Sequence, residues 1–243
     1  MSEKSREEAI VIRQEEIADG VFSMWLKTDE IAKNAKAGQF ISVYCKDGSR
    51  MLPRPISICE IDKKDGALRI VYRVAGKGTE EFSGMRAGMI LDILGPLGNG
   101  FPKKSKKAIL IGGGIGIPPM LELAKELECE KQIVLGYRDE LFLTEEFEKA
   151  GEIYLATEDG SMGTKGTVLD AIRVNELKAD IIYACGPMPM LKALAAYAEE
   201  HGMEAQISLE ERMACGIGAC LGCICKSKTK DHHTNVNNTR ICK

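Results

Sequence analysis

The chain has 243 residues, of which 44% are hydrophobic and 28% are charged, enough apolar material for one large domain or for two ordinary domains with a small appendage. A net charge of −3 gives no reason to expect a nucleic-acid partner. No apolar run approaches the ~20 residues that span a bilayer, and the charged N-terminal segment lacks the apolar core of a secretory signal. We therefore expect a cytoplasmic protein, in which clustered cysteines are more often metal ligands or redox groups than disulfides.

The first hundred residues have the pattern of an antiparallel barrel or sandwich. Glycine-containing turns separate short apolar and β-branched runs, which predict strands at 8–17, 21–28, 39–45, 55–62, 68–74 and 89–98. Within this half, Arg54-Pro55-Ile56-Ser57 combines a forked cationic donor with a backbone that proline stiffens. Such a segment suits a diphosphate and a ring edge, although a plain strand edge has the same composition.

A second segment of this half, Gly76–Glu80, places two glycines and Thr79 before a helical pattern. Free N–H groups at the start of a helix attract phosphate, so the segment is a candidate anion cradle. An ordinary turn capped by threonine has the same residues, and the local pattern does not separate the two.

The second hundred residues alternate between strands and helices. A strand, a glycine-rich turn and a helix fall within 106–128; strands are then expected at 132–139, 152–159 and 180–186, and helices at 143–151, 167–177 and 188–202. This alternation predicts βαβ units and a parallel sheet. The segment NGFPKK at 99–104 marks the boundary with the first half.

Glycines follow the first strand of this predicted sheet, in the turn GGGIGIPP. The turn departs from the dinucleotide fingerprint because Pro118 stands where the last glycine belongs, but it still allows close approach of a diphosphate before a helix. A tight turn without a ligand is the alternative. At the end of the fourth strand, Cys185 occupies the sheet edge where ligands sit in open α/β folds, although a buried core thiol is the commoner role for such a cysteine.

Near the C-terminus, Cys215, Cys220 and Cys223 have the spacing C-x4-C-x2-C, with Cys242 further on. This is the plant-type [2Fe–2S] spacing, and the intervening glycines suit a loop that turns its N–H groups toward sulfur. Structural zinc and disulfides remain open as alternatives. Zinc sites prefer two C-x2-C pairs, whereas only Cys220 and Cys223 have that spacing here.

In this order, RPIS, GKGT, GGGIGIPP and YACGPMPML resemble the ferredoxin–NADP reductase superfamily. The added segment ERMACGIGACLGCICK is similar to one branch of it, the electron-transfer subunits of class 1B dihydroorotate dehydrogenases. The resemblance implies a multidomain chain. It would have an FAD-binding antiparallel β-barrel at 1–101, an NAD-binding α/β domain with a parallel sheet at 102–206, and a small [2Fe–2S] domain at 207–243.

The resemblance also implies roles for individual residues. FAD would be contacted by Arg54, Pro55, Ile56, Ser57, Val71, Tyr72, Arg73, Gly78 and Thr79. NAD would be bound by Gly112, Gly113, Gly114, Gly116, Gly186 and Pro187, with Cys185 beside the nicotinamide as the candidate catalytic residue. The cluster would be held by Cys215, Cys220, Cys223 and Cys242, and Cys225 would not be needed.

The function implied by the resemblance is a relay of electrons to NAD⁺ in pyrimidine biosynthesis. An FMN-containing dihydroorotate dehydrogenase catalytic subunit would be the donor, in a heterotetramer with two copies of each subunit. FAD is required between the two ends because hydride transfer moves two electrons and an iron–sulfur cluster moves one. Arg138 is followed by the acids Asp139 and Glu140, which favours NAD over NADP.

Three alternative functions stay open at this point. The chain has the features of the small subunit of an NADH-dependent ferredoxin:NADP reductase and of a sulfhydrogenase-type diaphorase subunit, which have the same parts but different electron partners. A zinc-stabilised interaction module on a former flavoprotein scaffold is the non-enzymatic alternative. It predicts a colourless protein with zinc and no flavin.

The segment before Cys242 departs from the family pattern. It is polar and rich in asparagine, and it does not predict the strand and turn expected before a fourth ligand. His232 and His233 are candidate replacements for thiolates, as in Rieske centres, but Rieske ligands come as spaced Cys-x-His pairs. Adjacent histidines in a polar loop are more typical of a solvated pair. The sequence therefore leaves the fourth ligand open.

Overall fold

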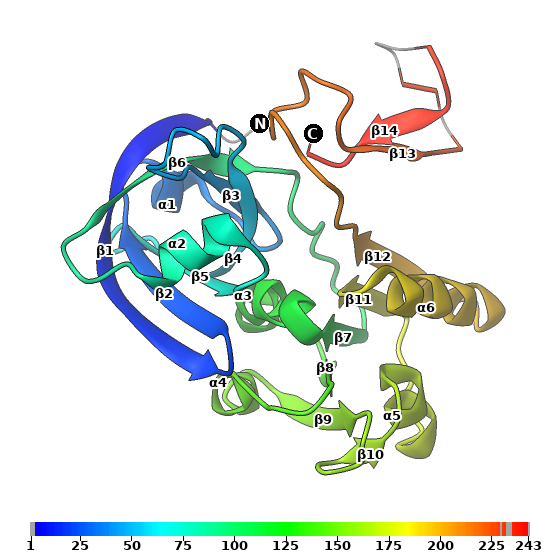
Figure 1. Ribbon diagram of the computed structural model, residues 1–243. Helices are drawn as coiled ribbons and strands as arrows, with labels where there is room; N and C mark the ends of the chain where they lie inside the picture. Colours follow the sequence, from blue (N-terminus) through cyan, green and yellow to red (C-terminus); the bar gives the residue numbers. More distant parts are fainter. Residues whose placement is uncertain (1–2, 229, 232–234, 243) are drawn as a thin grey trace.

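The computed structural model describes residues 3–228, 230–231 and 235–242, and its first half is a closed antiparallel barrel of six strands in the order β1-β2-β5-β4-β3-β6 (Figure 1). The strands are β1 (Ser5–Ala18), β2 (Val21–Lys27), β3 (Phe40–Val43), β4 (Arg54–Asp62), β5 (Ala67–Arg73) and β6 (Ile90–Leu97); the helices are α1 (Ile31–Asn34) and α2 (Lys77–Ser83). The long β1 closes the barrel because it pairs with both β2 and β6. The predicted antiparallel barrel is confirmed.

The second half is a six-stranded parallel sheet in the order β10-β9-β8-β7-β11-β12. Its strands are β7 (Ala108–Gly113), β8 (Lys131–Tyr137), β9 (Glu152–Thr157), β10 (Thr164–Lys165), β11 (Ile181–Cys185) and β12 (Glu204–Ser208). Its helices are η1 (Gly114–Gly116), α3 (Pro118–Glu126), α4 (Thr144–Glu148), α5 (Val168–Val174) and α6 (Met188–Glu200). The chain runs outward from β7 through β8, then returns to add β11 on the other side of β7. The strand order therefore reverses between β7 and β11, the position where such sheets bind ligands.

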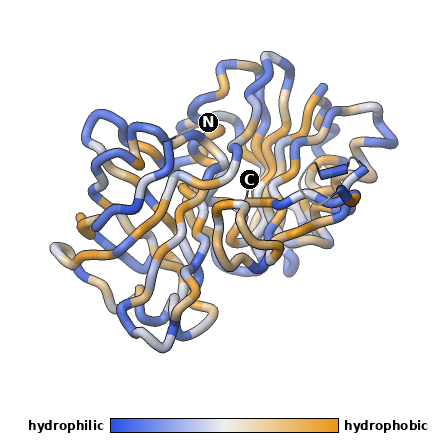
Figure 2. Tube along the Cα trace, turned by 90° about the horizontal axis from the view of Figure 1, so that it is seen from above, coloured by the Kyte–Doolittle hydropathy of each residue, from blue (hydrophilic) through white to orange (hydrophobic). Residues whose placement is uncertain are grey.

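The two halves share a hydrophobic core. Val21, Cys59 and Val71 of the barrel are buried in the same cluster as Leu110 of β7 and Leu121 of α3. Figure 1 shows α3 between the barrel and the sheet, and Figure 2 shows the hydrophobic segments following the strands, with hydrophilic stretches at the outer loops. The other face of the sheet packs against α5 and α6. The two halves are therefore packed directly against each other at α3.

Charged side chains reinforce this contact. Arg69 of β5 is only 5% exposed, and it binds Glu60 of β4 at 2.6 Å and Glu146 of α4 at 3.2 Å. Lys125 of α3 pairs with the other oxygen of Glu60. Glu60 thus joins two cations, one from each half of the molecule. Burial opposes ionisation of Glu60, but Lys125 and Arg69 outweigh it and hold the pKa of this carboxyl below its usual range.

We expect Glu60→Gln to destabilise the protein by about 2 kcal/mol at pH 7, because the substitution leaves two partly buried cations without their carboxylate. The folded-state pKa of Glu60 is lowered, so its contribution is present above the ordinary glutamate pKa of about 4.3 and is lost as the pH falls through the lowered value. Urea unfolding at pH values from 7 down through this lowered pKa should show that the difference in stability between the parent and Glu60→Gln becomes smaller as the pH falls. Glu15→Gln, at an exposed position of β1, is the control, and it should leave the free energy of unfolding unchanged at both ends of this pH range. A pH-independent difference would contradict the assignment.

A two-stranded antiparallel hairpin, β13 (Ile224–Lys226) and β14 (Asn238–Arg240), ends the chain. The sequence prediction that this polar segment lacks a strand and turn is therefore wrong. The pairing depends on backbone hydrogen bonds and on Arg240, which donates to the Gly218 carbonyl and pairs with Asp231 at 3.1 Å, rather than on apolar alternation. His232 and His233 lie outside the described residues. None of the described helices is long and apolar enough to cross a membrane.

Candidate functional site

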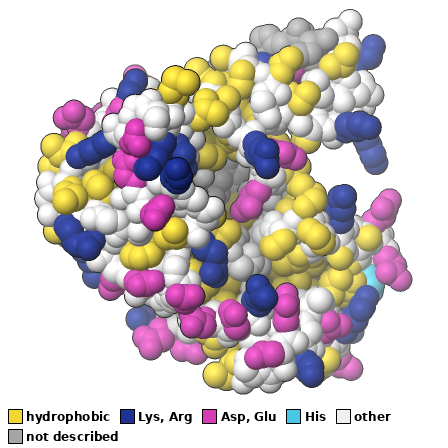
Figure 3. All heavy atoms as spheres, viewed as in Figure 1, with side chains coloured by type: hydrophobic (Ala, Val, Ile, Leu, Met, Phe, Trp, Pro, Cys, Tyr) yellow, Lys and Arg dark blue, Asp and Glu magenta, His cyan; other side chains and the backbone are white. Residues whose placement is uncertain are grey.

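A cavity of about 640 Å³ opens where the barrel, the parallel sheet and the C-terminal hairpin meet. In Figure 3 the molecule is visibly indented between the C-terminal part, at upper right, and the parallel-sheet part below it. The cavity wall includes most of the predicted flavin contacts: Arg54, Pro55, Ile56, Ser57, Val71, Tyr72, Arg73 and Thr79. The volume is typical of a site for a cofactor-sized ligand. Residues from β4, β5 and α2 thus meet around one space.

Arg54 lies at the start of β4, against the first turn of α2. Its Nη1 donates to the Leu52 carbonyl. A Cβ placed on Gly78 would lie 2.1 Å from the Arg54 Nε, so only glycine allows α2 to approach the guanidinium this closely. The Thr79 hydroxyl accepts the backbone N–H of Ala75 at 2.9 Å and so closes its own turn. The N-cap of α2 is Gly76 and Thr79 is the third residue of the helix, so the threonine N-cap expected as the alternative is not formed. The forked donor on the cavity wall is Arg54.

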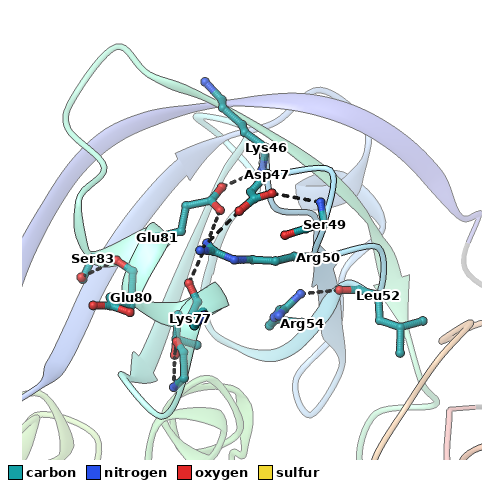
Figure 4. Close-up of polar contacts among 12 residues, drawn as sticks. Lys46, Asp47, Ser49, Arg50, Leu52, Arg54, Lys77, Glu80, Glu81 and Ser83 are labelled. Atoms are coloured by element: carbon teal, nitrogen blue, oxygen red, sulfur yellow. Dashed lines mark hydrogen bonds and ion pairs between the residues drawn. The ribbon is translucent and has the colours of Figure 1, made fainter.

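The loop before Arg54 is fastened to α2 by Arg50. Its guanidinium binds the Glu81 carboxylate at 2.6 Å and the Lys77 carbonyl at 2.9 Å, and the Lys46 backbone N–H donates to the same carboxylate at 2.6 Å (Figure 4). These contacts hold α2 beside the start of β4. The position of Arg54 is therefore fixed from both sides, which suits a site that must orient a diphosphate.

Tyr72 supplies an aromatic wall. Its ring stacks on Phe22 with centroids 6.0 Å apart and meets Phe82 edge-on at 6.2 Å. Its hydroxyl donates to Gln14 at 2.9 Å. Burial raises the pKa of Tyr72, so the phenol is neutral at physiological pH. A fixed neutral ring and a nearby guanidinium fit the apolar and anionic parts of a flavin nucleotide.

The predicted nucleotide loops lie side by side at the reversal point of the sheet. A Cβ on Gly116 would lie 2.5 Å from the backbone carbonyl of Cys185, and one on Gly113 would lie 2.5 Å from the Met190 sulfur. Gly114 has φ +53 and has nothing within 4 Å of its Cβ position. Two of these glycines thus let the loops pack together, while Gly114 leaves the open approach that a diphosphate needs.

Cys185 ends β11 in register with Gly112 of β7 and Ser208 of β12. Its side chain is only 1% exposed. Burial, with a smaller contribution from Glu210, raises the pKa of Cys185 to about 12. The group is therefore a neutral thiol at physiological pH, so any action at a nicotinamide would be by packing or weak hydrogen bonding rather than as a thiolate.

The four predicted cluster cysteines stand in two pairs. Cys223 Sγ lies 3.1 Å from Cys242 Sγ, and Cys215 Sγ accepts the backbone N–H of Cys220 at 3.3 Å. Burial disfavours the Cys215 thiolate, but hydrogen bonds from the backbone N–H groups of Cys220 and Ile217 outweigh it and lower the pKa of Cys215 to about 6. Within the described part of the chain, no three His, Cys, Asp or Glu side chains already form a metal-binding set. The donor chemistry nevertheless fits a thiolate-held cluster with N–H groups turned toward sulfur.

The cysteine segment packs on the barrel. Cys223 and Cys242 are buried in one cluster with Phe40 of β3 and Leu97 of β6. A Cβ on Gly216 would lie 3.0 Å from the Ser42 hydroxyl, so the loop itself approaches β3 closely. Phe40 also lines the 640 Å³ cavity. Phe40 therefore lies between the candidate cluster site and the candidate flavin site, and Met213 also lines the cavity and packs against the same cysteine cluster.

Comparison with known proteins agrees with this arrangement. Residues 210–243 match the iron–sulfur cluster binding domain of dihydroorotate dehydrogenase B. The chain is 43% identical over 244 residues to a protein of Fusobacterium nucleatum subsp. nucleatum named dihydroorotate dehydrogenase B (NAD(+)), electron transfer subunit, with 95% of this chain and 93% of that protein covered. Proteins of the same name from Streptococcus mutans serotype c and Caldanaerobacter subterraneus subsp. tengcongensis are 43% and 44% identical, covering 98% and 90% of this chain and 93% and 87% of theirs. The chain belongs to the family of dihydroorotate dehydrogenase B electron transfer subunits.

Solved structures extend the comparison beyond this dihydroorotate dehydrogenase B family. The chain is similar to a subunit in the structure of an NADH-dependent reduced ferredoxin–NADP oxidoreductase, with a TM-score of 0.86, 29% identity, and coverage of 96% of this chain and 85% of that one. A cytochrome P450 reductase of Amycolatopsis shares the fold at a TM-score of 0.73 and 21% identity, covering 85% and 70%. The predicted combination of a flavin-reductase barrel and a nucleotide-binding sheet is confirmed at the level of fold.

Several residues that line the cavity were not among the site residues predicted from the sequence of this dihydroorotate dehydrogenase B family member. They include Phe101, the segment from Gln206 to Glu211, Thr239 and Arg240 of the hairpin, and Ile241 after it. β12 was missed because EAQIS is short and half-buried, without an apolar run. The one available signal was its place after the last helix of a βα series. β12 also continues to Ser208, past the boundary expected at 206.

Proposed function

We propose that this chain is the electron-transfer subunit of an NAD⁺-dependent dihydroorotate dehydrogenase, and that it carries electrons from the catalytic subunit through a [2Fe–2S] cluster and FAD to NAD⁺ in pyrimidine biosynthesis. The names of its relatives support this function. When bound, FAD and the cluster supply the exchange between hydride and single-electron transfer, which side chains cannot provide. The observation that carries the proposal is the position of Phe40, which lies in the cavity wall and against the buried cysteines.

Each part of the chain has its own task in this proposal. The barrel binds FAD, with Arg54 facing the diphosphate and Tyr72 forming the wall of the ring site. The loops at Gly112–Gly116 and Cys185–Pro187 bind the dinucleotide at the reversal point of the sheet. Cys215, Cys220, Cys223 and Cys242 hold the cluster. The packing of the cysteine segment on β3 and β6 places the cluster site next to the flavin site.

We also infer what the chain works with and where. The name shared by its relatives implies a catalytic subunit, and we propose that this partner contains FMN and assembles as two copies of each chain. Dihydroorotate oxidation would then occur entirely in the partner, which explains why this chain needs no base for that step. None of the nine cysteines forms a disulfide in the structure, and four of them are proposed cluster ligands, which supports a reducing, cytoplasmic location.

A visible spectrum and an NADH titration of the purified full-length chain test the proposal. We expect flavin absorption with a broad reddish iron–sulfur contribution, and bleaching of the flavin on addition of NADH. Partner capture from the native cell extract, followed by assay for dihydroorotate oxidation, tests the choice of electron donor. A colourless protein containing zinc would contradict the proposal and support the interaction module instead.

A second function has one observation in its favour. The 29% identity to the NADH-dependent reduced ferredoxin–NADP oxidoreductase chain extends over 96% of this chain, so it includes the cysteine segment. On this alternative the captured partner would be a flavoprotein that reduces NADP⁺ and has no dihydroorotate activity. The identity of the partner therefore separates the two functions.

A further inference from the structure

Helix α3 connects the nucleotide loop to the barrel strand that carries the flavin motif. It begins at Pro118, directly after the Gly114–Gly116 turn. One turn along, Glu122 is only 8% exposed, and its Oε2 accepts a hydrogen bond of 3.0 Å from the backbone N–H of Ile61 on β4. The same β4 begins at Arg54. A single side chain thus links the two elements that hold the candidate nucleotide and flavin sites.

The Ile61 N–H needs this acceptor. β3 pairs with β4 only between Arg54 and Ser57, while β5 pairs with the opposite edge, where Leu68 faces Ile61. The Glu122 carboxylate stands where a further strand would have supplied a carbonyl. Burial raises the pKa of Glu122, and the bond from Ile61 acts in the opposite direction. A buried carboxylate and a buried backbone N–H each cost free energy when they lack a hydrogen-bond partner. The Glu122 carboxylate and the Ile61 N–H therefore hold each other in place.

A second contact repeats this link. Lys125, three residues further along α3, pairs with Glu60, the residue before Ile61. Consecutive residues of β4 are therefore held by successive positions on one face of α3. Sliding or tilting of the helix along the strand would break both contacts. The nucleotide turn at the start of α3 has a fixed distance and direction from the start of β4.

We propose that Glu122 is a positioning residue for hydride exchange between the nicotinamide and the flavin, and that it acts by fixing the Gly114–Gly116 turn relative to Arg54–Ser57. This inference rests on the proposed function. Hydride transfer requires the reacting atoms to be held within a narrow range of distance and angle, and a displacement of about 1 Å costs on the order of a hundredfold in rate. Glu122 touches neither reactant, so its effect passes through the backbone of β4.

The test compares Glu122→Leu, which removes the acceptor at similar size, with Glu122→Gln, whose amide oxygen still accepts the Ile61 N–H. Glu126→Gln is the matched control, because Glu126 lies on the same helix but pairs with Lys103 at 3.2 Å instead of with β4. Stopped-flow reduction of the FAD-loaded chain by NADH gives the maximal rate and the half-saturating NADH concentration. Hydrogen–deuterium exchange on the cofactor-free chain follows the β4 amides independently of activity.

For Glu122→Leu we expect a maximal rate lower by about tenfold with a half-saturating concentration changed by less than about twofold, because binding groups stay in place while alignment is lost. The Ile61 amide should exchange faster in this variant alone. In Glu122→Gln and in Glu126→Gln, both the maximal rate and the exchange rate of the Ile61 amide should equal those of the parent. If Glu122→Leu loses FAD or melts early, Glu122→Ala takes its place, since it removes the acceptor without adding an apolar branch.

A failure of the proposed function and a failure of the positioning role give different results. A parent chain whose flavin is not reduced by NADH would overturn the proposed function and this role together. A normal parent rate with an unchanged rate in Glu122→Leu, or with a change confined to the half-saturating concentration, would overturn only the positioning role. That role would also be overturned if Glu122→Gln behaved like Glu122→Leu, or if Glu122→Leu and Glu122→Ala both failed to hold FAD, because Glu122 would then be a structural residue.

Discussion

Cys220→Ala is expected to abolish the iron–sulfur cluster while leaving FAD and the NADH-dependent reduction of an artificial acceptor largely intact. Cys220 lies in the loop of the first three predicted ligands, where its Sγ accepts the Gly222 N–H at 3.4 Å and its own N–H donates to Cys215. A cluster deprived of one thiolate loses its attachment, whereas the candidate flavin cavity does not include this residue. Iron and acid-labile sulfide analysis, together with electron paramagnetic resonance of the reduced protein, measures the loss.

Cys225→Ala is the matched control for this substitution. Cys225 lies on β13 and lines the cavity, but it is outside the predicted ligand set. Its removal should leave iron content at the parent level. Full iron content in Cys220→Ala would exclude Cys220 as a ligand. Loss of NADH-driven flavin reduction in the same variant would show that the cluster and the flavin do not function as separable units.

The second large effect is expected from Gly116→Ala. The added Cβ would lie 2.5 Å from the carbonyl carbon and oxygen of Cys185 and from the N of Gly186, all of them backbone atoms that cannot rotate away. One of the two predicted nucleotide loops must move, and we expect NADH-dependent flavin reduction to fall by about a hundredfold while FAD remains bound. Rapid-mixing absorbance at the flavin band measures the rate, and flavin released on denaturation gives the content.

Gly202→Ala provides the comparison for a glycine of the same half. Gly202 has φ +65 but nothing within 4 Å of its Cβ position, so alanine there meets only backbone strain of about 1 kcal/mol. Its melting temperature should fall slightly and its flavin reduction should match the parent. If Gly116→Ala reduced flavin as fast as Gly202→Ala, the contact between the two loops would have no role in nucleotide binding.

The sequence predicted the local elements well because their signals are local. Six apolar runs with glycine turns become the six barrel strands, and the GGGIGIPP turn lies between a parallel strand and its helix. The predicted flavin contacts could be taken from the family because RPIS is a contiguous segment, and the structure places this segment around one cavity with Tyr72 and Thr79.

Features that depend on distant partners were not predictable in this way. Arg69 meets Glu146 across 77 positions of sequence, and no pattern around either residue indicates the other. The hairpin before Cys242 escaped because Arg240 supports it through Gly218 and Asp231 rather than through alternating apolar residues. Glu122 looks like an exposed helix carboxylate until β4 is placed against it. In each case the cost of burying a polar group is offset by a partner that is distant in sequence and is brought close only by the fold.

The packing of Cys242 against Phe40 has a consequence for how the protein is made. These residues lie far apart in the chain, and their contact closes a loop that spans most of its length. During synthesis the barrel leaves the ribosome before Cys242 has been made. Assembly of the candidate cluster site must therefore wait until Cys242 has been synthesised. The barrel strands β3 and β6 then provide the surface on which the cysteine segment packs.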